Sequence, residues 1–348
     1  MIAHSLIYPA PALPLRVGVI GVGNMGQHHA RILNALPTVQ LIGICDIRPE
    51  RGVRQARHYG VGYFQDYRGL LPNVDAVCIA VPTPLHHDIG LDCLRSPCHV
   101  LIEKPIATSV SEAQSLLSTA RQCHRILQVG HIERFNPAFL ALKHHLGASP
   151  ILHLAAERLS PQLDRGSDVS VVMDLMIHDL DLMSLLVAAP VQAVSAQGHY
   201  LVSGYLAAAT ATLQFGNGLL GTLTASKISP YKRRWLRVRG QTFDIEANFL
   251  GREAQMHRFL QSSQTVDSDY PPEQHTVCPP TTETYSQDPL RAELEEFVTC
   301  ICDRTPPSIS NNQALTALHL AKLIENCVAK NKSEKAVQKN TLISTPTT

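Results

Sequence analysis

Residues 16–26 read RVGVIGVGNMG, and the helical run QHHARILNAL follows directly. The segment joins a buried strand, a glycine turn with the spacing G-x-G-x-x-G, and the start of a helix. Gly21 permits the sharp turn, Gly23 lets the backbone approach a pyrophosphate, and Gly26 lets the helix pack against the strand. The helix start adds free N–H groups and the positive end of the helix dipole. The segment therefore predicts a parallel α/β sheet that binds a dinucleotide at its first turn.

An acidic residue follows the second predicted strand, where a dinucleotide presents its adenosine ribose. Asp46 comes directly after Gln40–Cys45 and can accept hydrogen bonds from the ribose hydroxyls. Its charge would repel the 2′-phosphate of NADP, whereas Arg48 and Arg51 could cradle that phosphate. On this balance we predict NAD as the cofactor.

The first 135 residues alternate short β-branched runs with helical patterns, which is typical of a parallel sheet wrapped by helices. The runs are apolar throughout, as expected for strands buried on both faces. We assign residues 1–135 to a NAD-binding domain with a Rossmann doubly wound parallel sheet. The predicted strands are Val17–Gly21, Gln40–Cys45, Ala76–Val81 and His99–Ile102, and the predicted helices include Gln27–Leu36 and Ser111–Gln122.

The pattern changes after Pro137, where predicted strands follow one another directly. Consecutive strands indicate an α+β domain with a large, mostly antiparallel sheet, which we assign to residues 136–330. Asn217-Gly218 predicts a hairpin turn, because both residues tolerate positive φ. We expect a loop at 262–287 and a disordered polar tail at 331–348. The predicted strands are Ile151–Leu159, Val191–Leu201, Ala207–Phe215, Leu219–Ser226, Trp235–Arg239 and Phe243–Ala247, and the predicted helices are Val171–Leu186, Pro289–Cys302 and Asn312–Ala329.

Composition argues against several classes of protein. A chain of 348 residues is long enough for two domains, and its net charge of +1 provides no field that attracts nucleic acid or an anionic membrane. No apolar run reaches the ~18 residues that span a bilayer. The N-terminal stretch lacks a basic start and contains three prolines, unlike a signal peptide. Nine cysteines without a C-x-x-C pair fit free thiols, so we expect a cytoplasmic protein without a metal site.

Two further turns follow later strands of the first domain. AVPTPLHH, at Ala80–His87, leaves the third strand through two prolines, and HVLIEKPIA places Glu103 and Lys104 at the end of the fourth. Both turns should lie at the carboxyl edge of the sheet, where ligands bind in open α/β folds.

Five motifs in order, GVIGVGNMG, PTPLHH, EKPIA, GHIERFNP and DLMIHDLD, resemble those of the Gfo/Idh/MocA family of sugar and polyol dehydrogenases over about residues 15–330. The resemblance implies a Rossmann domain followed by a domain with a large open sheet. In this family the open sheet often forms the oligomer interface, so we expect a homodimer or homotetramer. The resemblance also implies that Thr83 and His86 line the cofactor site, that Glu103 and Lys104 reach the nicotinamide ribose, and that the Lys104–Pro105 bond is cis. The candidate cofactor residues are Gly21, Gly23, Asn24, Met25, Gly26, Asp46, Pro82, Thr83, His86, Glu103 and Lys104.

The run VVMDLMIHDLDLMSLL places Asp174, His178 and Asp181 at i, i+4 and i+7, on one face of a largely apolar helix. Polar groups on a buried helix must pair or face a wet cavity. The stripe suits acid–base catalysis, a divalent-metal site or a structural network. The resemblance favours catalysis, because the family has an Asp and a His at this spacing in its substrate site. Met176 stands where the family commonly has glycine.

Oxidation of a secondary alcohol moves a hydride to the nicotinamide while the hydroxyl proton goes to a base. A cationic nicotinamide and a dry site both favour the neutral amine of Lys104. His178, backed by Asp174, could equally take the proton. We predict that Lys104, His178 and Asp174 are catalytic, with His178 as proton acceptor and Lys104 orienting the alcohol; the two roles can be exchanged.

GHIERFNP places Arg134 and Asn136 at the predicted domain junction, where they can reach a bound sugar. Arg134 could instead form an interdomain salt bridge. The basic residues Lys227 and 232–234 suit either an anionic substrate or a solvated strand edge. The candidate substrate-binding residues are Lys104, Arg134, Asn136, Asp174 and His178.

GHIERFNP with MIHDLDL most resembles the branch of the family that acts on UDP-N-acetylglucosamine. That resemblance implies NAD-dependent oxidation of the 3-hydroxyl of this UDP-sugar in the bacterial cytoplasm. A partner aminotransferase would then make the 3-amino sugar used in lipid A. The alternatives are a dehydrogenase of a free sugar or inositol, a reductase of another small carbonyl compound, and a dinucleotide-sensing regulator. The histidine pairs His28–His29 and His144–His145 are expected to face solvent.

Overall fold

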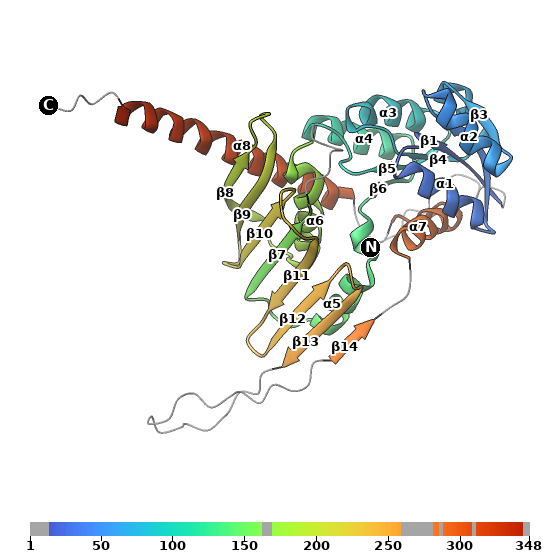
Figure 1. Ribbon diagram of the computed structural model, residues 1–348. Helices are drawn as coiled ribbons and strands as arrows, with labels where there is room; N and C mark the ends of the chain where they lie inside the picture. Colours follow the sequence, from blue (N-terminus) through green and yellow to red (C-terminus); the bar gives the residue numbers. More distant parts are fainter. Residues whose placement is uncertain (1–13, 162–168, 259–280, 285–287, 308–310, 344–348) are drawn as a thin grey trace. The chain divides into compact units, whose positions relative to one another are not determined.

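The computed structural model describes residues 14–161, 169–258, 281–284, 288–307 and 311–343, which form two compact units (Figure 1). The first unit comprises residues 1–135 and 287–318, and the second comprises 136–286 and 319–348. Residues 1–13 and most of the predicted loop at 262–287 lie outside the described residues.

Six parallel strands form the sheet of the first unit, in the order β3-β2-β1-β4-β5-β6, which confirms the predicted parallel sheet. The strand order reverses between β1 and β4, which is where doubly wound sheets bind ligands. The strands are β1 (Leu15–Ile20), β2 (Val39–Cys45), β3 (Gly62–Phe64), β4 (Ala76–Ile79), β5 (His99–Glu103) and β6 (Leu127–Gly130).

Helices cross between these strands, as parallel pairing requires. Helix α1 packs against β1 and β2, α2 packs against β2 and β3, and α3 packs against β5 and α4. The crossover helices are α1 (Gly26–Ala35), α2 (Pro49–Tyr59), α3 (His86–Arg95) and α4 (Val110–Gln122).

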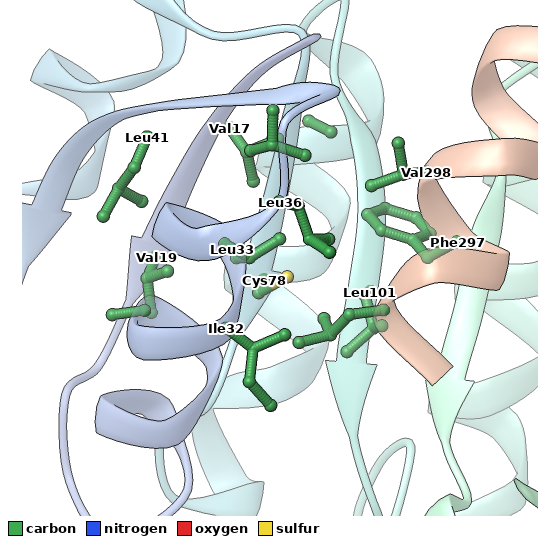
Figure 2. Packing of buried hydrophobic residues seen from close by; sticks show 14 of the residues in the cluster. Val17, Val19, Ile32, Leu33, Leu36, Leu41, Cys78, Leu101, Phe297 and Val298 are labelled. Atoms are coloured by element: carbon green, nitrogen blue, oxygen red, sulfur yellow. The ribbon is translucent and has the colours of Figure 1, made fainter. Parts of the chain in front are cut away.

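Helix α7 (Pro289–Asp303) belongs to the first unit, whereas the sequence pattern had placed it in the second domain. Its buried residues Leu294 and Phe297 join a core cluster with Leu33 of α1 and Leu101 of β5 (Figure 2). The domain boundary at residue 135 therefore describes only part of this unit. An amphipathic pattern predicts a helix with one buried face, but it does not show which core that face completes.

Eight strands form the sheet of the second unit, in the order β14-β13-β12-β11-β7-β10-β9-β8. Only the β7–β10 pair is parallel, so the predicted, mostly antiparallel sheet is confirmed. The strands are β7 (His153–Leu159), β8 (Val191–Tyr200), β9 (Leu206–Phe215), β10 (Leu220–Ser226), β11 (Arg233–Arg239), β12 (Phe243–Asn248), β13 (Glu253–Arg258) and β14 (Thr281–Thr284).

The predicted hairpin joins β9 to β10. Gly218 has a φ of +84°, and its N–H donates to the Phe215 carbonyl oxygen at 2.9 Å. Two other predictions for this unit need correction. Strand β14 lies within the predicted loop at 262–287 and pairs with β13. Helix α8 (Asn311–Ile343) continues through most of the predicted disordered tail. Although this segment is polar, its lysine, glutamate and alanine residues favour helix.

Three helical segments of the second unit pack on its sheet. Helix α5 (Pro137–Leu146) packs against β12 and β13, and α6 (Ile177–Leu186) packs against β7. A π-helical turn, Val172–Met176, precedes α6 and contacts β10. Along β10, Leu223 and Ala225 are buried whereas the alternate residues are half-buried, so one sheet face is covered more than the other.

Among the described residues, no helix combines the length and apolar character needed to cross a membrane.

Candidate active site

The glycine turn after β1 has the geometry that a bound dinucleotide requires. Gly21 has a φ of +84°, and a Cβ there would lie 2.7 Å from the Ala80 carbonyl oxygen. A Cβ on Gly26 would lie 1.8 Å from the Gly21 oxygen, so α1 can begin here only with glycine. A Cβ on Gly23 would meet only the Arg51 guanidinium, at 3.7 Å, which leaves the backbone of Gly23 open to a ligand. No side chain caps α1, so the positive end of its helix dipole faces the glycine turn. The N–H groups of Gln27 and His28 donate to the carbonyl oxygens of Gly23 and Met25.

Asp46 stands at the end of β2 and is 4% exposed. Its carboxylate accepts hydrogen bonds from the backbone N–H groups of Val22, at 3.0 Å, and Arg48, at 2.9 Å. Arg51 forms a two-point ion pair with it, with Nη2 at 3.2 Å and Nε at 3.0 Å from its two oxygens. Arg51 is therefore engaged with the acidic residue itself.

A cavity of about 520 Å³ opens at the carboxyl ends of β1, β2 and β4. It has the position and size expected of a cofactor site. Asn24, Gly26, Thr83 and His86 do not line it. The predicted residues that do are Gly21, Gly23, Met25, Asp46, Pro82, Glu103 and Lys104.

His86 holds the wall of this cavity rather than lining it. Its ring is 1% exposed and lies between two carbonyl oxygens, with Nδ1 2.8 Å from Pro105 O and Nε2 2.9 Å from Val81 O. Burial lowers the pKa of His86, and contact with the carbonyl oxygens opposes that shift. The ring ties the Pro-Thr-Pro turn to the Glu-Lys-Pro turn, whose Lys104–Pro105 bond is cis as predicted.

Glu103 is tied to a histidine that the sequence analysis had assigned to solvent. His29 is 0% exposed, and its Nε2 lies 2.9 Å from Glu103 Oε1. Burial acts to raise the pKa of Glu103, but His29 and Lys104 outweigh it and bring the pKa below its ordinary value. Glu103 is therefore an anion directly before Lys104. The i, i+3 spacing of His29 with Ile32 and Gly26, all buried on one face of α1, was the signal available in the sequence.

The second unit holds Asp174 and His178 on consecutive helical segments. Asp174 lies in the π-helical turn, and His178 lies in the first turn of α6. π-Helical turns are rare in proteins, and many of those that do occur lie at functional sites. The Asp174 side chain is 38% exposed, and its Oδ2 lies 2.6 Å from Lys227 Nζ. Asp181, which the helical spacing placed on the same face, is buried at 1% exposure.

A second ion pair in this unit is completely buried. Arg158 of β7 donates to Asp179 of α6 through Nε and Nη2, at distances of 2.8 to 3.2 Å. The two side chains are 1% and 2% exposed. Because Asp179 directly follows His178, this pair fixes the start of α6 against the sheet. Neither Arg158 nor Asp179 stood out in the sequence.

Arg134 and Asn136 are both buried, at 5% exposure. Asn136 caps helix α5, since its Oδ1 accepts from the Ala138 N–H at 3.1 Å and its Nδ2 donates to Phe249 O at 3.2 Å. Asn136 therefore has an N-cap role that the Asn-Pro sequence could have indicated, and its contact with a sugar stays a prediction. Arg134 acts electrostatically on Glu293, a carboxyl of α7 that is 0% exposed. Burial raises the pKa of Glu293 well above its ordinary value.

Lys104 belongs to the first unit, and Asp174 and His178 belong to the second. Among the described residues, no group of three His, Cys, Asp or Glu side chains could hold a metal ion.

Comparison with known proteins identifies the family of both parts of the chain. Residues 15–131 match the model of the Gfo/Idh/MocA oxidoreductase family, NAD-binding Rossmann fold, and residues 143–246 match the GFO/IDH/MocA C-terminal domain. The chain is 35% identical over 292 residues to UDP-N-acetylglucosamine 3-dehydrogenase of Acidithiobacillus ferrooxidans, covering 84% of this chain and 90% of the relative. A solved structure of that enzyme aligns with a TM-score of 0.81 at 32% identity, over 90% of this chain and 97% of the other. The scyllo-inositol 2-dehydrogenase (NAD(+)) of Bacillus subtilis is 25% identical over 329 residues, covering 88% of this chain and 92% of the relative.

The glycine turn, the acidic residue after β2 and the cavity between them define a dinucleotide-binding site. Together with the family and the relatives that the chain matches, they identify an NAD(P)-dependent oxidoreductase that acts on a CH–OH group. The chain belongs to the Gfo/Idh/MocA family.

Proposed function

We propose that the protein oxidises the 3-hydroxyl of UDP-N-acetylglucosamine to a 3-keto sugar nucleotide, with NAD as oxidant. The observation that carries the proposal is similarity over 84% of the chain to a relative named for this activity. The site residues support it, because Lys104 lines the cofactor cavity and Asp174 is partly exposed in the second unit. A ketone at C3 is the substrate that a sugar aminotransferase needs, which fits a cytoplasmic step toward the 3-amino sugar of lipid A.

Asp46 supports NAD over NADP. Its carboxylate is buried where the adenosine ribose binds in Rossmann folds, and it is held by two backbone N–H groups. A 2′-phosphate at this position would meet that charge. Arg51, which could otherwise bind the phosphate, is paired with Asp46.

The protein's own residues must hold the sugar and accept its hydroxyl proton. NAD, when bound, supplies the hydride acceptor at C4 of its nicotinamide. In our proposal Lys104, held at the cavity wall by the Glu-Lys-Pro turn, orients and polarises the alcohol. His178 accepts the proton, and Asp174 binds the sugar beside it.

Inositol dehydrogenases are the second candidate class. The chain is 25% identical to the scyllo-inositol enzyme and 29% identical to the myo-inositol 2-dehydrogenase of Thermotoga maritima, the latter over 62% of this chain. A free cyclic polyol has the same secondary alcohol but no diphosphate. The two classes are therefore separated by substrate rather than by chemistry.

The deciding experiment incubates the protein with NAD or NADP and a panel of UDP-sugars, scyllo-inositol and myo-inositol. NADH formation is followed by absorbance, with and without an aminotransferase and amino donor that drain the ketone. We expect turnover with UDP-N-acetylglucosamine and NAD, and more of it in the drained reaction. Turnover of an inositol but of no UDP-sugar would replace the proposed function with the second candidate. A protein that binds NADH but oxidises nothing would point to a dinucleotide sensor.

The proton acceptor is identified by the pH dependence of kcat/KM in Lys104→Ala and His178→Ala. The variant that lacks the base should lose the acidic limb of the profile. A variant that keeps both limbs retains its base, so an unchanged profile in His178→Ala would assign that role to Lys104.

The open face of the eight-stranded sheet is our proposed oligomer interface. Half-buried Thr222 and Thr224 alternate with buried residues along β10, and the Thr224 hydroxyl lies 3.3 Å from that of Thr210 on β9. We expect sedimentation at the mass of a dimer or tetramer. Thr224→Arg, which places a charge on this face, should shift the protein to smaller species.

A further inference from the structure

Lys227 follows the last residue of β10 and is 15% exposed. Its Nζ lies 2.6 Å from Asp174 Oδ2 and 3.3 Å from the carbonyl oxygen of Val169. The ring of Tyr205 is 5.4 Å from the same nitrogen, measured to the ring centroid. Groups from three parts of the second unit therefore fix the direction of the ammonium group.

The burial of this pair is unequal. The lysine is the more buried partner, whereas the carboxylate of Asp174 is 38% exposed. A largely buried lysine is costly unless it is paired and hydrogen-bonded. Burial alone would lower the pKa of Lys227, but Asp174 and Tyr205 together outweigh it and the pKa is raised. The ammonium group of Lys227 thus stays charged. It pairs with Asp174 from the protein interior, while the carboxylate of Asp174 stays accessible to solvent.

The backbone at Asp174 supports the same interpretation. The π-helical turn is anchored by Ser170, whose Oγ accepts from the Met173 N–H at 3.2 Å and donates to Glu325 of α8. Lys227 also contacts Val169, directly before this serine. The turn that carries Asp174 is therefore fixed by Lys227, directly after β10, and by Glu325 of α8, while α6 is fixed separately by Arg158.

Resting on the proposed function, we propose that Lys227 is a positioning residue for the oxidation. It holds the Asp174 side chain in place so that this carboxylate accepts a hydrogen bond from a hydroxyl of the bound sugar. Lys227 acts through Asp174 and does not itself contact the reacting carbon.

The test compares Lys227→Met, Lys227→Arg and Asp174→Asn with the double variant Lys227→Met/Asp174→Asn. Lys143→Met, an exposed lysine of α5, is the matched control. With UDP-N-acetylglucosamine and NAD, we expect Lys227→Met to lower kcat/KM by about 10- to 100-fold, because Asp174 is no longer held in position to accept its charged hydrogen bond from the substrate. Lys227→Arg should recover most of that loss. In the Asp174→Asn background, Lys227→Met should cost less than about threefold, because coupled residues are not additive.

Two measurements separate positioning from a purely structural role. NADH binding, followed by fluorescence, should match that of the unmodified protein in every variant, because Lys227 lies in the other unit. Ethylammonium added to Lys227→Ala should recover part of kcat/KM, whereas a misfolded variant would not respond. Unchanged kcat/KM in Lys227→Met would overturn the proposal. The proposal would also be overturned if Lys227→Met lowered kcat/KM by the same factor in the Asp174→Asn background as in the unmodified protein.

Failure of this proposal is distinguishable from failure of the proposed function. If no UDP-sugar is oxidised, the proposed function fails, and the variants are compared on the panel substrate that is oxidised. Thermal unfolding requires no substrate: Lys227→Met should lower Tm by about 2–4 °C, with no further loss when Asp174→Asn is added. An additive loss would show that the pair is not coupled.

Discussion

One carboxylate–cation pair lies at the cofactor cavity of the first unit and another at the proposed sugar site of the second unit, and the more buried partner differs between them. In the first unit the Asp46 side chain is 4% exposed, whereas that of its partner Arg51 is 32% exposed. In the second unit the lysine is the more buried partner, with 15% of its side chain exposed against 38% for the carboxylate of Asp174. Asp46 is further fixed by backbone N–H groups of the glycine turn, whereas Asp174 depends on side chains. The first site is built mainly from backbone, and the second mainly from ion pairs between distant segments.

The largest effect should come from the backbone of the first site. Gly26→Val would place atoms beyond a Cβ that already lies 1.8 Å from the Gly21 oxygen. We expect NADH binding to weaken by about 100-fold or more, measured by fluorescence titration. Gly60→Ala is the matched control, because Gly60 has a φ of +68° and open space around it. It should cost about 1 kcal/mol of unfolding free energy and leave NADH affinity intact. Equal losses of affinity in both variants would contradict a backbone-built site.

The second effect tests whether the other unit depends on ion pairs. Arg158→Met leaves Asp179 buried without its partner and should lower the free energy of unfolding by about 3–5 kcal/mol in urea. Arg291→Gln breaks an exposed pair with Glu295 and should cost less than about 0.5 kcal/mol. The double variant Arg158→Met/Asp179→Leu should recover much of the loss. If Arg158→Met lowered the free energy of unfolding by no more than Arg291→Gln does, the buried pair would not stabilise the position of α6.

A smaller effect sharpens the contrast between the two carboxylates. Asp46→Ala should lower kcat/KM for NAD by about 10- to 100-fold, because the ribose contact is lost, and should raise it for NADP as Arg51 is released. The ratio of kcat/KM with NAD to kcat/KM with NADP is measured on whichever substrate of the panel the protein oxidises. Glu50→Ala, an exposed carboxyl nearby, should leave the ratio unchanged. An Asp46→Ala protein that still prefers NAD would remove Asp46 as the determinant of specificity.

The smallest effect concerns a side-chain contact within the first unit. The His99 Nδ1 accepts from the Ile126 N–H at 2.9 Å, and burial, followed by the charge of Arg125, lowers the pKa of His99 to about 4. Between pH 6.5 and 4 the unfolded chain therefore binds more protons, so stability falls as pH falls. From pH 7 to pH 5 this group should remove about 2 kcal/mol.

Urea unfolding at the two pH values measures that loss. His99→Gln keeps an acceptor for Ile126 but cannot be protonated, so its loss on acidification should be smaller by this amount. The same substitution at exposed His58 should leave the pH dependence unchanged. A His99→Gln protein with the full pH dependence would show that other groups produce it.

The first site could be predicted from the sequence because its parts lie close together in the chain. The glycine turn, the start of α1 and Asp46 all fall within 31 residues, and each role follows from local backbone needs. The hairpin at Asn217-Gly218 was predictable for the same reason. His29 was missed because its partner Glu103 is 74 residues away, and only the fold brings them together.

The second site was predicted in part. The spacing of Asp174 and His178 was visible, but the π-helical turn that carries Asp174 was not, because no local composition indicates it. Lys227 had two open interpretations until its distance to Asp174 was known. Asn136 was assigned to the sugar although its sequence also fits an N-cap, which is the role that its hydrogen bonds have. For Lys227 it was a tertiary contact, with a residue 53 positions earlier in the chain, that distinguished the two interpretations.

Helix α7 limits how this protein can be divided. Leu294 and Phe297 are completely buried in the core of the first unit, yet they come more than 150 residues after its sheet ends. A fragment cut after Phe135 would expose the apolar surface that α7 covers and should be prone to aggregate. Residues 1–135 therefore do not form a domain that can be moved to another protein by themselves. Exchanging it between relatives would require transplanting 287–318 as well, or synthesising that helix as a separate peptide that restores solubility in trans.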